Sequence, residues 1–155
     1  MEVQNLYEEN NVLSFTLSGV NVSIANSLRR IILSEIPCVV FQTTPYEQNK
    51  VNIEKNTTRM NNELIKQRLS CIPIFINDLK TPIDNYQVII NKQNTSDNIE
   101  FITTEDIDII DKKLNKSLDI NLIRNIFPKN SFTNDFIDIV RLRPSLSKES
   151  EGEQL

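Results

Sequence analysis

Histidine and tryptophan are absent from this chain of 155 residues, and glycine occurs only twice. Without histidine there is no imidazole base, so catalytic pairs of the Ser-His or Cys-His kind are excluded. Phosphate-binding loops of the GxxxxGK[ST] and GxGxxG types are also missing, and two glycines could hardly support one. The sequence therefore predicts no catalytic residues and no cofactor.

Cysteine is as rare as glycine, since Cys38 and Cys71 are the only two and no CxxC pair occurs. A structural zinc site needs four Cys or His ligands, so this chain cannot build one alone. We expect both cysteines to be buried as small apolar residues in a reducing compartment, rather than joined in a disulfide. No metal is predicted.

Long apolar runs and an excess of basic residues are missing as well. No segment approaches the ~20 apolar residues of a membrane-spanning helix, and residues 1–10 are too acidic and polar for a signal peptide. The net charge of −4 and the pI of about 4.9 argue against a protein that neutralises phosphates. We therefore expect an intracellular, soluble protein with no membrane contact and no direct DNA binding.

Residues 21–37, NVSIANSLRRIILSEIP, predict one amphipathic helix. Asn21 or Ser23 caps its first turn, and Pro37 ends it. Arg30 lies on the polar side and Arg29 at its border. The apolar arc is about 140° wide, more than one packing surface needs, so we expect the helix to pack on its own sheet and on something else. The arc consists of Ile24, Ala25, Leu28, Ile31, Ile32 and Ile36.

The rest of the chain predicts an α+β domain of short elements. Alternation indicates a strand at residues 12–18, and an apolar run indicates a strand covered on both faces at 38–44. A second helix is expected at 61–74, with Asn61 or Asn62 as its cap and Ile65, Leu69 and Ile72 on one face. Residues 86–93 and 98–106 read as a hairpin, and 136–144 as another strand. In residues 107–127 the apolar residues follow neither the helical nor the strand period, so we expect short irregular pieces there. Residues 145–155 resemble a disordered acidic tail.

Two other hypotheses concern chemistry. A run of carboxylates could hold a divalent metal, as an enzyme would, but it alternates with isoleucine as a solvated strand face does. The run consists of Glu105, Asp106, Asp108 and Asp111. Alternatively, four arginines could form a sequence-independent nucleic-acid-binding module, whose binding would be steeply salt-sensitive. They are Arg29, Arg30, Arg141 and Arg143.

The segment NSLRRIILSEIP resembles the signature of the α-type assembly subunits of multisubunit DNA-dependent RNA polymerases. That family includes the bacterial α subunit, the archaeal D-type subunit and the third-largest eukaryotic subunit. The matching residues are Ala25, Asn26, Leu28, Arg29, Arg30, Ile31, Ile32, Glu35, Ile36 and Pro37. A second segment resembles the next motif of the family through Asn56, Thr57, Thr58, Glu63, Arg68, Leu69, Ile72 and Pro73. Weaker matches at residues 88–107 and 136–155 favour the archaeal and eukaryotic branch.

The resemblance implies a dimerisation domain, with a helix on an antiparallel sheet, interrupted by a mostly β insertion domain. Residues 1–42 would be the first part of the dimerisation domain and 43–155 the insertion, with the second part missing after 155. The implied function is a non-catalytic scaffold that forms a heterodimer with a smaller α-like subunit and nucleates docking of the second-largest subunit. The implied heterodimer interface is Ile24, Leu28, Ile31 and Ile32. Arg29 and Arg30 would face the second-largest subunit.

Two departures from the family pattern matter. Many relatives carry a cysteine cluster for zinc or iron–sulfur in the insertion, and this chain has none, so the resemblance adds no metal. Relatives also continue beyond the position of Leu155, so the chain is either a fragment or one half of a split subunit, and its polar tail would then be the start of an unfinished hairpin. In both cases an exposed apolar face is expected. The abundance of Asn and Ile suggests an AT-rich genome, such as that of a large DNA virus. The expected location is the nucleus or cytoplasm, or a viral replication site.

Overall fold

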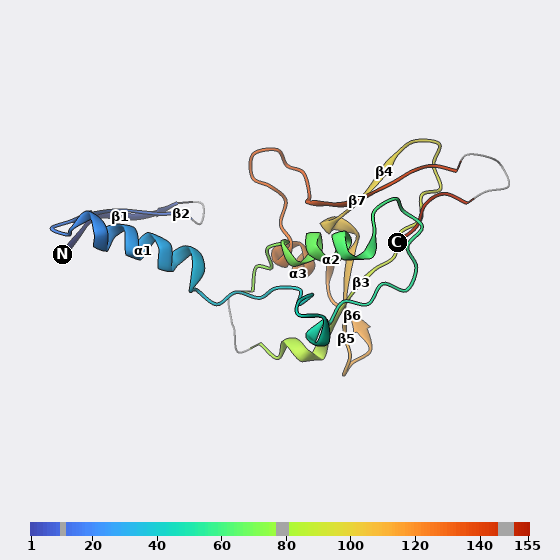
Figure 1. Ribbon diagram of the computed structural model, residues 1–155, viewed down its shortest axis with the longest axis horizontal. Coiled ribbons are helices and arrows are strands. Elements are labelled where there is room, and N and C mark those ends of the chain that lie inside the picture. The colour runs from blue at the N-terminus through green and yellow to red at the C-terminus, as the bar shows by residue number, and fades with distance from the viewer. Residues whose placement is uncertain (10–11, 77–80, 146–150) are drawn as a thin grey trace. The chain divides into compact units, whose positions relative to one another are not determined.

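The computed structural model describes residues 1–9, 12–76, 81–145 and 151–155. The chain divides into two compact units, Met1–Cys38 and Val39–Leu155, each described here by itself (Figure 1). Both combine helices with antiparallel strands, so the predicted α+β class is confirmed.

Unit 1, Met1–Cys38, consists of a hairpin and a helix. Strand β1 (Glu2–Glu9) pairs antiparallel with β2 (Val12–Ser18). A bulge interrupts the pairing between Gln4 and Tyr7, where Asn5 has a φ of 52°. Strand β2 is predicted by its alternating pattern, whereas β1 is not, because its acidic sequence and its bulge break any period of two.

Helix α1 (Val22–Ser34) follows a turn at Gly19, whose φ of 68° favours glycine. The side chain of Asn21 accepts a hydrogen bond from the Ser23 amide at 2.9 Å and caps the first turn. At the other end the Glu35 amide donates to Ile31 O at 2.8 Å. The predicted helix is therefore confirmed, with one of its two candidate caps selected.

The predicted strand at residues 38–44 is wrong. This segment forms no ladder with any described part of the chain; its Gln42 carbonyl accepts only from the Lys50 amide, at 2.9 Å. Its apolar residues are only partly used for packing: the Phe41 ring stacks on Phe127 with centroids 6.2 Å apart, whereas Val40 is 51% exposed. An apolar run predicts burial, but a strand also requires a neighbour to pair with. A short 3₁₀ turn, η1 (Tyr46–Gln48), follows.

Helix α2 (Asn62–Ser70) confirms the second predicted helix. Asn61 is its cap and accepts a hydrogen bond from the Leu64 amide at 2.9 Å. Ile65 and Leu69 on one face, and Ile72 just beyond the helix, are buried as expected. The helix contacts β7 (Asp138–Leu142), the strand predicted near the C-terminus.

Two small antiparallel sheets complete unit 2, Val39–Leu155. One has the order β3-β5-β6, from β3 (Tyr86–Ile90), β5 (Ile107–Asp111) and β6 (Lys116–Ser117). The other pairs β4 (Glu100–Thr103) with β7. The 3₁₀ turns η2 (Ile83–Asn85) and η3 (Thr104–Asp106) precede β3 and β5. Helix α3 (Ile120–Ile126) follows β6 and precedes β7 in the sequence.

This pairing contradicts two expectations. Residues 86–93 and 98–106 do not form a hairpin, because β3 pairs with β5 while β4 pairs with β7. Buried Asn94 separates them, since its side chain donates to Asn98 O at 2.8 Å and Leu142 O at 3.1 Å. Residues 107–127 are not irregular either. They contain two strands and a helix, each too short to show its own period.

The C-terminal residues 151–155 are also ordered, contrary to the expectation of a disordered tail; residues 146–150 of that tail lie outside the described residues. Lys92 and Leu155 exchange two backbone hydrogen bonds, of 2.9 and 3.1 Å. The Asn94 amide donates to Glu153 O at 2.9 Å. A polar tail can be fixed when its charged group and its backbone both find partners in the domain.

The hydrophobic core lies entirely in unit 2. It consists of Ile65, Leu69, Ile72, Ile102, Ile107, Ile109, Ile123, Phe127, Ile139, Val140 and Leu142. Cys38 and Cys71 are exposed and free, so the prediction that they are buried is wrong. Cys38 ends a unit that buries none of its described residues, and Cys71 is the C-cap of α2. None of the described helices is long and apolar enough to cross a membrane.

Candidate subunit interface

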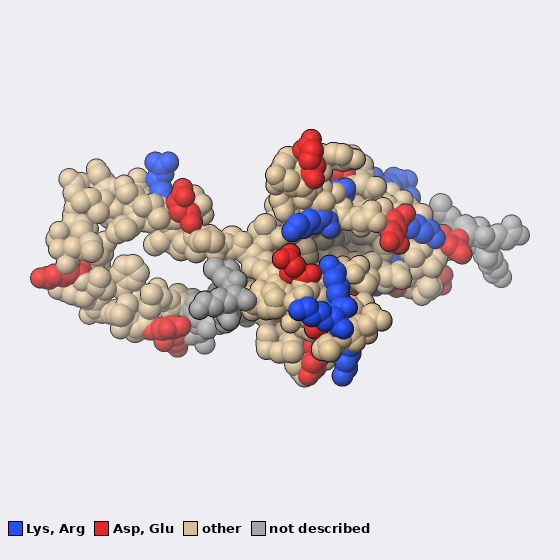
Figure 2. Space-filling view, turned by 90° about the horizontal axis from the view of Figure 1, so that it is seen from below, with Lys and Arg blue, Asp and Glu red and all other residues tan. Residues whose placement is uncertain are grey.

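Unit 1 contains no buried residue among those described, although α1 carries a wide apolar arc. Ile24, Ile31 and Ile32 are 51%, 51% and 55% exposed, and Leu28 is 39% exposed. By contrast, Ile65 in α2 is fully buried. Figure 2 shows open space between the helix and the hairpin of this unit. The unit therefore lacks the packed interior that normally stabilises a helix of this pattern.

The hairpin adds apolar side chains that the sequence did not assign to an interface. Leu13 and Phe15 of β2 are exposed, as are Val3, Leu6 and Tyr7 of β1. The alternation of β2 predicts a half-buried face, which is a detectable signal. The contribution of β1 had no such signal, because the bulge places its apolar residues out of step.

Two motif residues of α1 act on each other. Arg29 donates to the side-chain oxygen of Asn26 from Nε at 3.2 Å and from Nη2 at 2.9 Å, so its guanidinium is held toward the polar flank. The exposed guanidinium of Arg30 makes no hydrogen bond or ion pair with the described residues. Its planar fork of donors is therefore free of the rest of the described chain.

The motif residues of unit 2 serve the fold. The Asn56 side chain donates to Met60 O at 2.8 Å and accepts from the Thr58 amide at 2.9 Å, which shapes the loop before α2. Arg68 donates from Nη2 to Asp138 O at 2.8 Å and joins α2 to β7. Both residues belong to structural hydrogen bonds, which gives their place in the motif a physical reason.

The other motif residues lie at helix ends or in the core. Leu69 is buried in the core. Glu63 lies in the first turn of α2, where the helix dipole favours a carboxylate. Glu35 is the C-cap of α1. Pro37 and Pro73 follow the two helices, where proline prevents their continuation.

The weak match at residues 136–155 corresponds to a close contact between β7 and the C-terminal residues. Arg143 donates to the Glu153 carboxylate from Nε at 2.6 Å and from its backbone amide at 2.8 Å. Burial raises the pKa of Glu153, but the hydrogen bonds and charge of Arg143 outweigh burial and hold the pKa below its ordinary value. At Gly152, a Cβ atom would lie 2.0 Å from Asn94 O, so only glycine fits.

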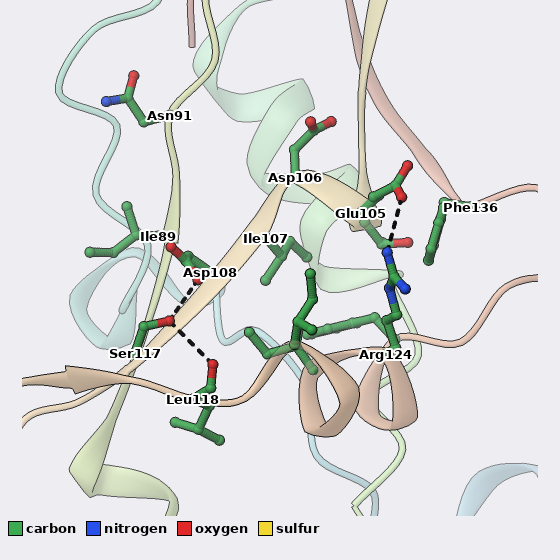
Figure 3. Close-up of a pocket in the computed structure, with 14 residues that line it drawn as sticks. Ile89, Asn91, Glu105, Asp106, Ile107, Asp108, Ser117, Leu118, Arg124 and Phe136 are labelled. Atoms are coloured by element: carbon green, nitrogen blue, oxygen red, sulfur yellow. Dashed lines mark hydrogen bonds and ion pairs between the residues drawn. The ribbon is translucent and has the colours of Figure 1, made fainter.

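The carboxylates near β5 are engaged with the protein. Asp106 pairs with Lys92 at 3.0 Å, and Glu105 with Arg124 at 3.7 Å. They border a hollow with an apolar floor between η3, β5 and α3, where Figure 3 shows the Glu105–Arg124 pair. Asp108 and Asp111 accept hydrogen bonds from Ser117 and the Lys113 amide. The described residues contain no group of three or more ligands suited to a metal ion.

The four arginines of the nucleic-acid hypothesis are divided between the two units. Arg29 and Arg30 belong to unit 1, whereas Arg141 and Arg143 belong to unit 2. Arg143 is committed to Glu153. On the face of unit 2 seen in Figure 2, lysines and arginines alternate with acidic residues rather than forming a basic patch. Nothing in this arrangement favours phosphate binding.

The comparison with known proteins agrees with the motifs. Residues 14–127, most of the chain, match the RNA polymerase Rpb3/Rpb11 dimerisation domain. The chain therefore belongs to the family of polymerase subunits built on that domain, which confirms the resemblance drawn from its sequence motifs.

Three relatives show the range of the family. The chain is 35% identical to the DNA-directed RNA polymerase subunit Rpo3 of Pyrococcus furiosus over 88 residues, 57% of this chain and 29% of that protein. It is 37% identical to the DNA-directed RNA polymerases I and III subunit rpac1 of Dictyostelium discoideum over 79 residues, 51% and 21% of the two chains. It is 35% identical to the DNA-directed RNA polymerase II subunit RPB3 of Schizosaccharomyces pombe over 72 residues, which are 46% of this chain and 22% of that protein. The chain spans less than a third of the length of these relatives.

Proposed function

We propose that this chain forms part of a non-catalytic scaffold subunit of a DNA-directed RNA polymerase. In this proposal it forms a heterodimer with a smaller α-like subunit, and the heterodimer recruits the second-largest subunit. The observation that carries the proposal is the aliphatic arc of α1, exposed on a unit that buries none of its described residues. Membership of the dimerisation-domain family supports the same reading.

The arc is large enough to matter energetically. Ile24, Leu28, Ile31 and Ile32 are each about half exposed. Fully burying one such side chain contributes about 1.5–3 kcal/mol. Covering the remaining half of all four would contribute about 3–6 kcal/mol before the entropic costs of association. Neighbouring apolar residues of β1 and β2 would add to this.

Arg29 and Arg30 are proposed to face the second-largest subunit. Arg30 offers a guanidinium without partners among the described residues, and such a fork binds carboxylates or carbonyls in two places at once. Arg29 is held by Asn26 on the same flank. Both lie away from the centre of the aliphatic arc, so the two contacts could form together.

The domain assignment is part of the proposal. Residues 1–42 would be the first part of the dimerisation domain and 43–155 the insertion. The chain's own division, after Cys38, lies near this boundary. Catalysis would belong to the large subunits. The site of action would be intracellular, in the nucleus or cytoplasm, or at a replication site if a virus encodes the protein.

Co-expression tests the proposed heterodimer. The full-length protein is produced with the smaller α-like subunit from the same source, and the pair is isolated through a tag on the smaller one. Ile31→Asp should abolish co-purification, because it places a charge in the aliphatic arc. Ser34→Asp, on the polar side of the same helix, is the matched control and should leave the pair intact. Equal recovery of both variants would contradict the proposed interface.

A further inference from the structure

The loop between α3 and β7 presents a phenylalanine almost entirely to solvent. Phe132 is 95% exposed, more than any other large hydrophobic residue of the described chain. It stands in the middle of residues 128–135, all of which are exposed. Figure 1 shows this loop extending away from both α3 and β7. Packing against the described residues does not explain this position.

The loop is nevertheless held in one conformation by its own hydrogen bonds. The Asn130 side chain accepts from the Phe132 amide at 2.8 Å and from the Thr133 amide at 3.3 Å. The Asn130 amide donates to Asp135 O, and the Asn134 amide to Asn130 O, both at 2.9 Å. Phe132 is therefore presented on a pre-organised turn, which lowers the entropic cost of binding through it.

Both ends of the loop are fixed to the domain. Phe127, before the loop, is buried and stacked on Phe41. After the loop, Ile137 and Thr104 exchange hydrogen bonds of 2.9 and 3.2 Å. Lys129 lies 4.9 Å from the centre of the Phe136 ring and closes the base. Both ends of the loop are therefore attached to buried residues of unit 2, Phe127 and Thr104.

The charge of the loop indicates the kind of partner. Around Phe132 lie small, neutral, hydrogen-bonding residues, and the flanking Lys129 and Asp135 cancel each other. Nucleic acids and acidic membranes select clusters of Lys and Arg, which this loop lacks. An aromatic side chain within a neutral polar rim instead fits a protein pocket, because interface anchors have this composition.

The area that Phe132 can bury shows whether this side chain could hold a partner without other contacts. A phenylalanine buries roughly 200 Å², whereas a stable interface between two proteins needs about 1,200 Å² in total. Phe132 cannot therefore hold a second copy of the chain by itself. We infer that Phe132 is a secondary anchor that enters an apolar pocket of another subunit of the same assembly. This inference rests on the proposed polymerase role.

Photo-crosslinking in the assembled enzyme tests the anchor. Phe132 is replaced by p-benzoylphenylalanine in the full-length protein, and the polymerase is purified and irradiated. We expect a crosslink to one defined peptide of another polymerase subunit. The same replacement at Tyr46, which is 85% exposed in the same unit, should give little product. Phe132→Ala should make that subunit dissociate roughly 10- to 30-fold faster, while Tyr46→Ala should not.

The outcomes separate the two proposals. An intact polymerase in which position 132 crosslinks to no other subunit, or only to a second copy of this chain, would overturn the anchor and leave the scaffold role standing. Failure of the unmodified protein to associate with any polymerase subunit would overturn the scaffold role and the anchor together.

Discussion

Replacing Gly152 by alanine should loosen the C-terminal residues from the insertion. The added Cβ would lie 2.0 Å from Asn94 O, whereas real contacts of this kind stay beyond 3.0 Å. The two atoms nearest to the Cβ position are the backbone O and C of Asn94, which no side-chain rotation can move away. The backbone at Gly152 or at Asn94 must therefore move by about 1 Å.

The cost follows from the bonds that this movement strains. Three backbone hydrogen bonds join residues 92–94 to 153–155, with lengths of 2.9 to 3.1 Å. At about 1 kcal/mol each, their loss would destabilise the segment by about 3 kcal/mol. Weakening of the Arg143–Glu153 pair would increase the effect.

Amide hydrogen exchange of the full chain measures the change directly. In Gly152→Ala, the amides of Asn94 and Leu155 should exchange roughly 100-fold faster, the equivalent of about 3 kcal/mol. Gly19→Ala is the matched control. Gly19 has a positive φ but no atom within 3.5 Å of its Cβ position, the nearest lying at 3.6 Å, so it should leave these two amides unchanged. Unchanged protection in Gly152→Ala would refute the steric argument.

Three further predictions concern single side chains. Glu153→Gln should destabilise the chain by about 2 kcal/mol at neutral pH. The pKa of Glu153 in the folded chain lies below its ordinary value of 4.5. The difference in unfolding free energy between the wild-type chain and Glu153→Gln should therefore be full above pH 4.5 and shrink as the pH falls through the folded pKa. Urea unfolding at several pH values checks this. Arg68→Ala should lower the free energy of unfolding by about 1 kcal/mol through loss of its bond to Asp138 O, whereas Gln67→Ala on the same helix should not. Arg30→Ala should weaken capture of the second-largest subunit in a pull-down while the heterodimer stays intact. Dissociation of the heterodimer itself would show that Arg30 lies in the heterodimer interface and does not face the second-largest subunit.

Local signals predicted α1 and α2 well, whereas α3 lies in a segment that was expected to be irregular. Asn21 and Asn61 cap α1 and α2 as their sequence positions indicate, and both helices end before a proline. The aliphatic arc of α1 was readable from its period, because a helix face is a property of a few consecutive turns. The family of the chain was likewise readable from ordered motifs.

The errors arose where partners distant in sequence decide the structure. Lys92 pairs with Leu155 rather than with its neighbour across the expected turn, and residues 38–44 have no strand beside them in the described chain. An exposed apolar face was expected from the missing second part of the family domain, but the helical pattern alone describes a helix buried in its own domain equally well. Only the structure shows that Ile31 and Ile32 remain half exposed.

Hydrogen exchange of α1, measured in the free protein and in the heterodimer, tests whether this helix is a partner surface. The α1 amides should exchange rapidly in the free protein and be strongly protected in the heterodimer, with α2 equally protected in both. Helix α1 lacks a packed interior when alone, whereas α2 has Ile65 and Leu69 in the core. Equal protection of α1 in the free and paired states would show that α1 is not covered by the partner.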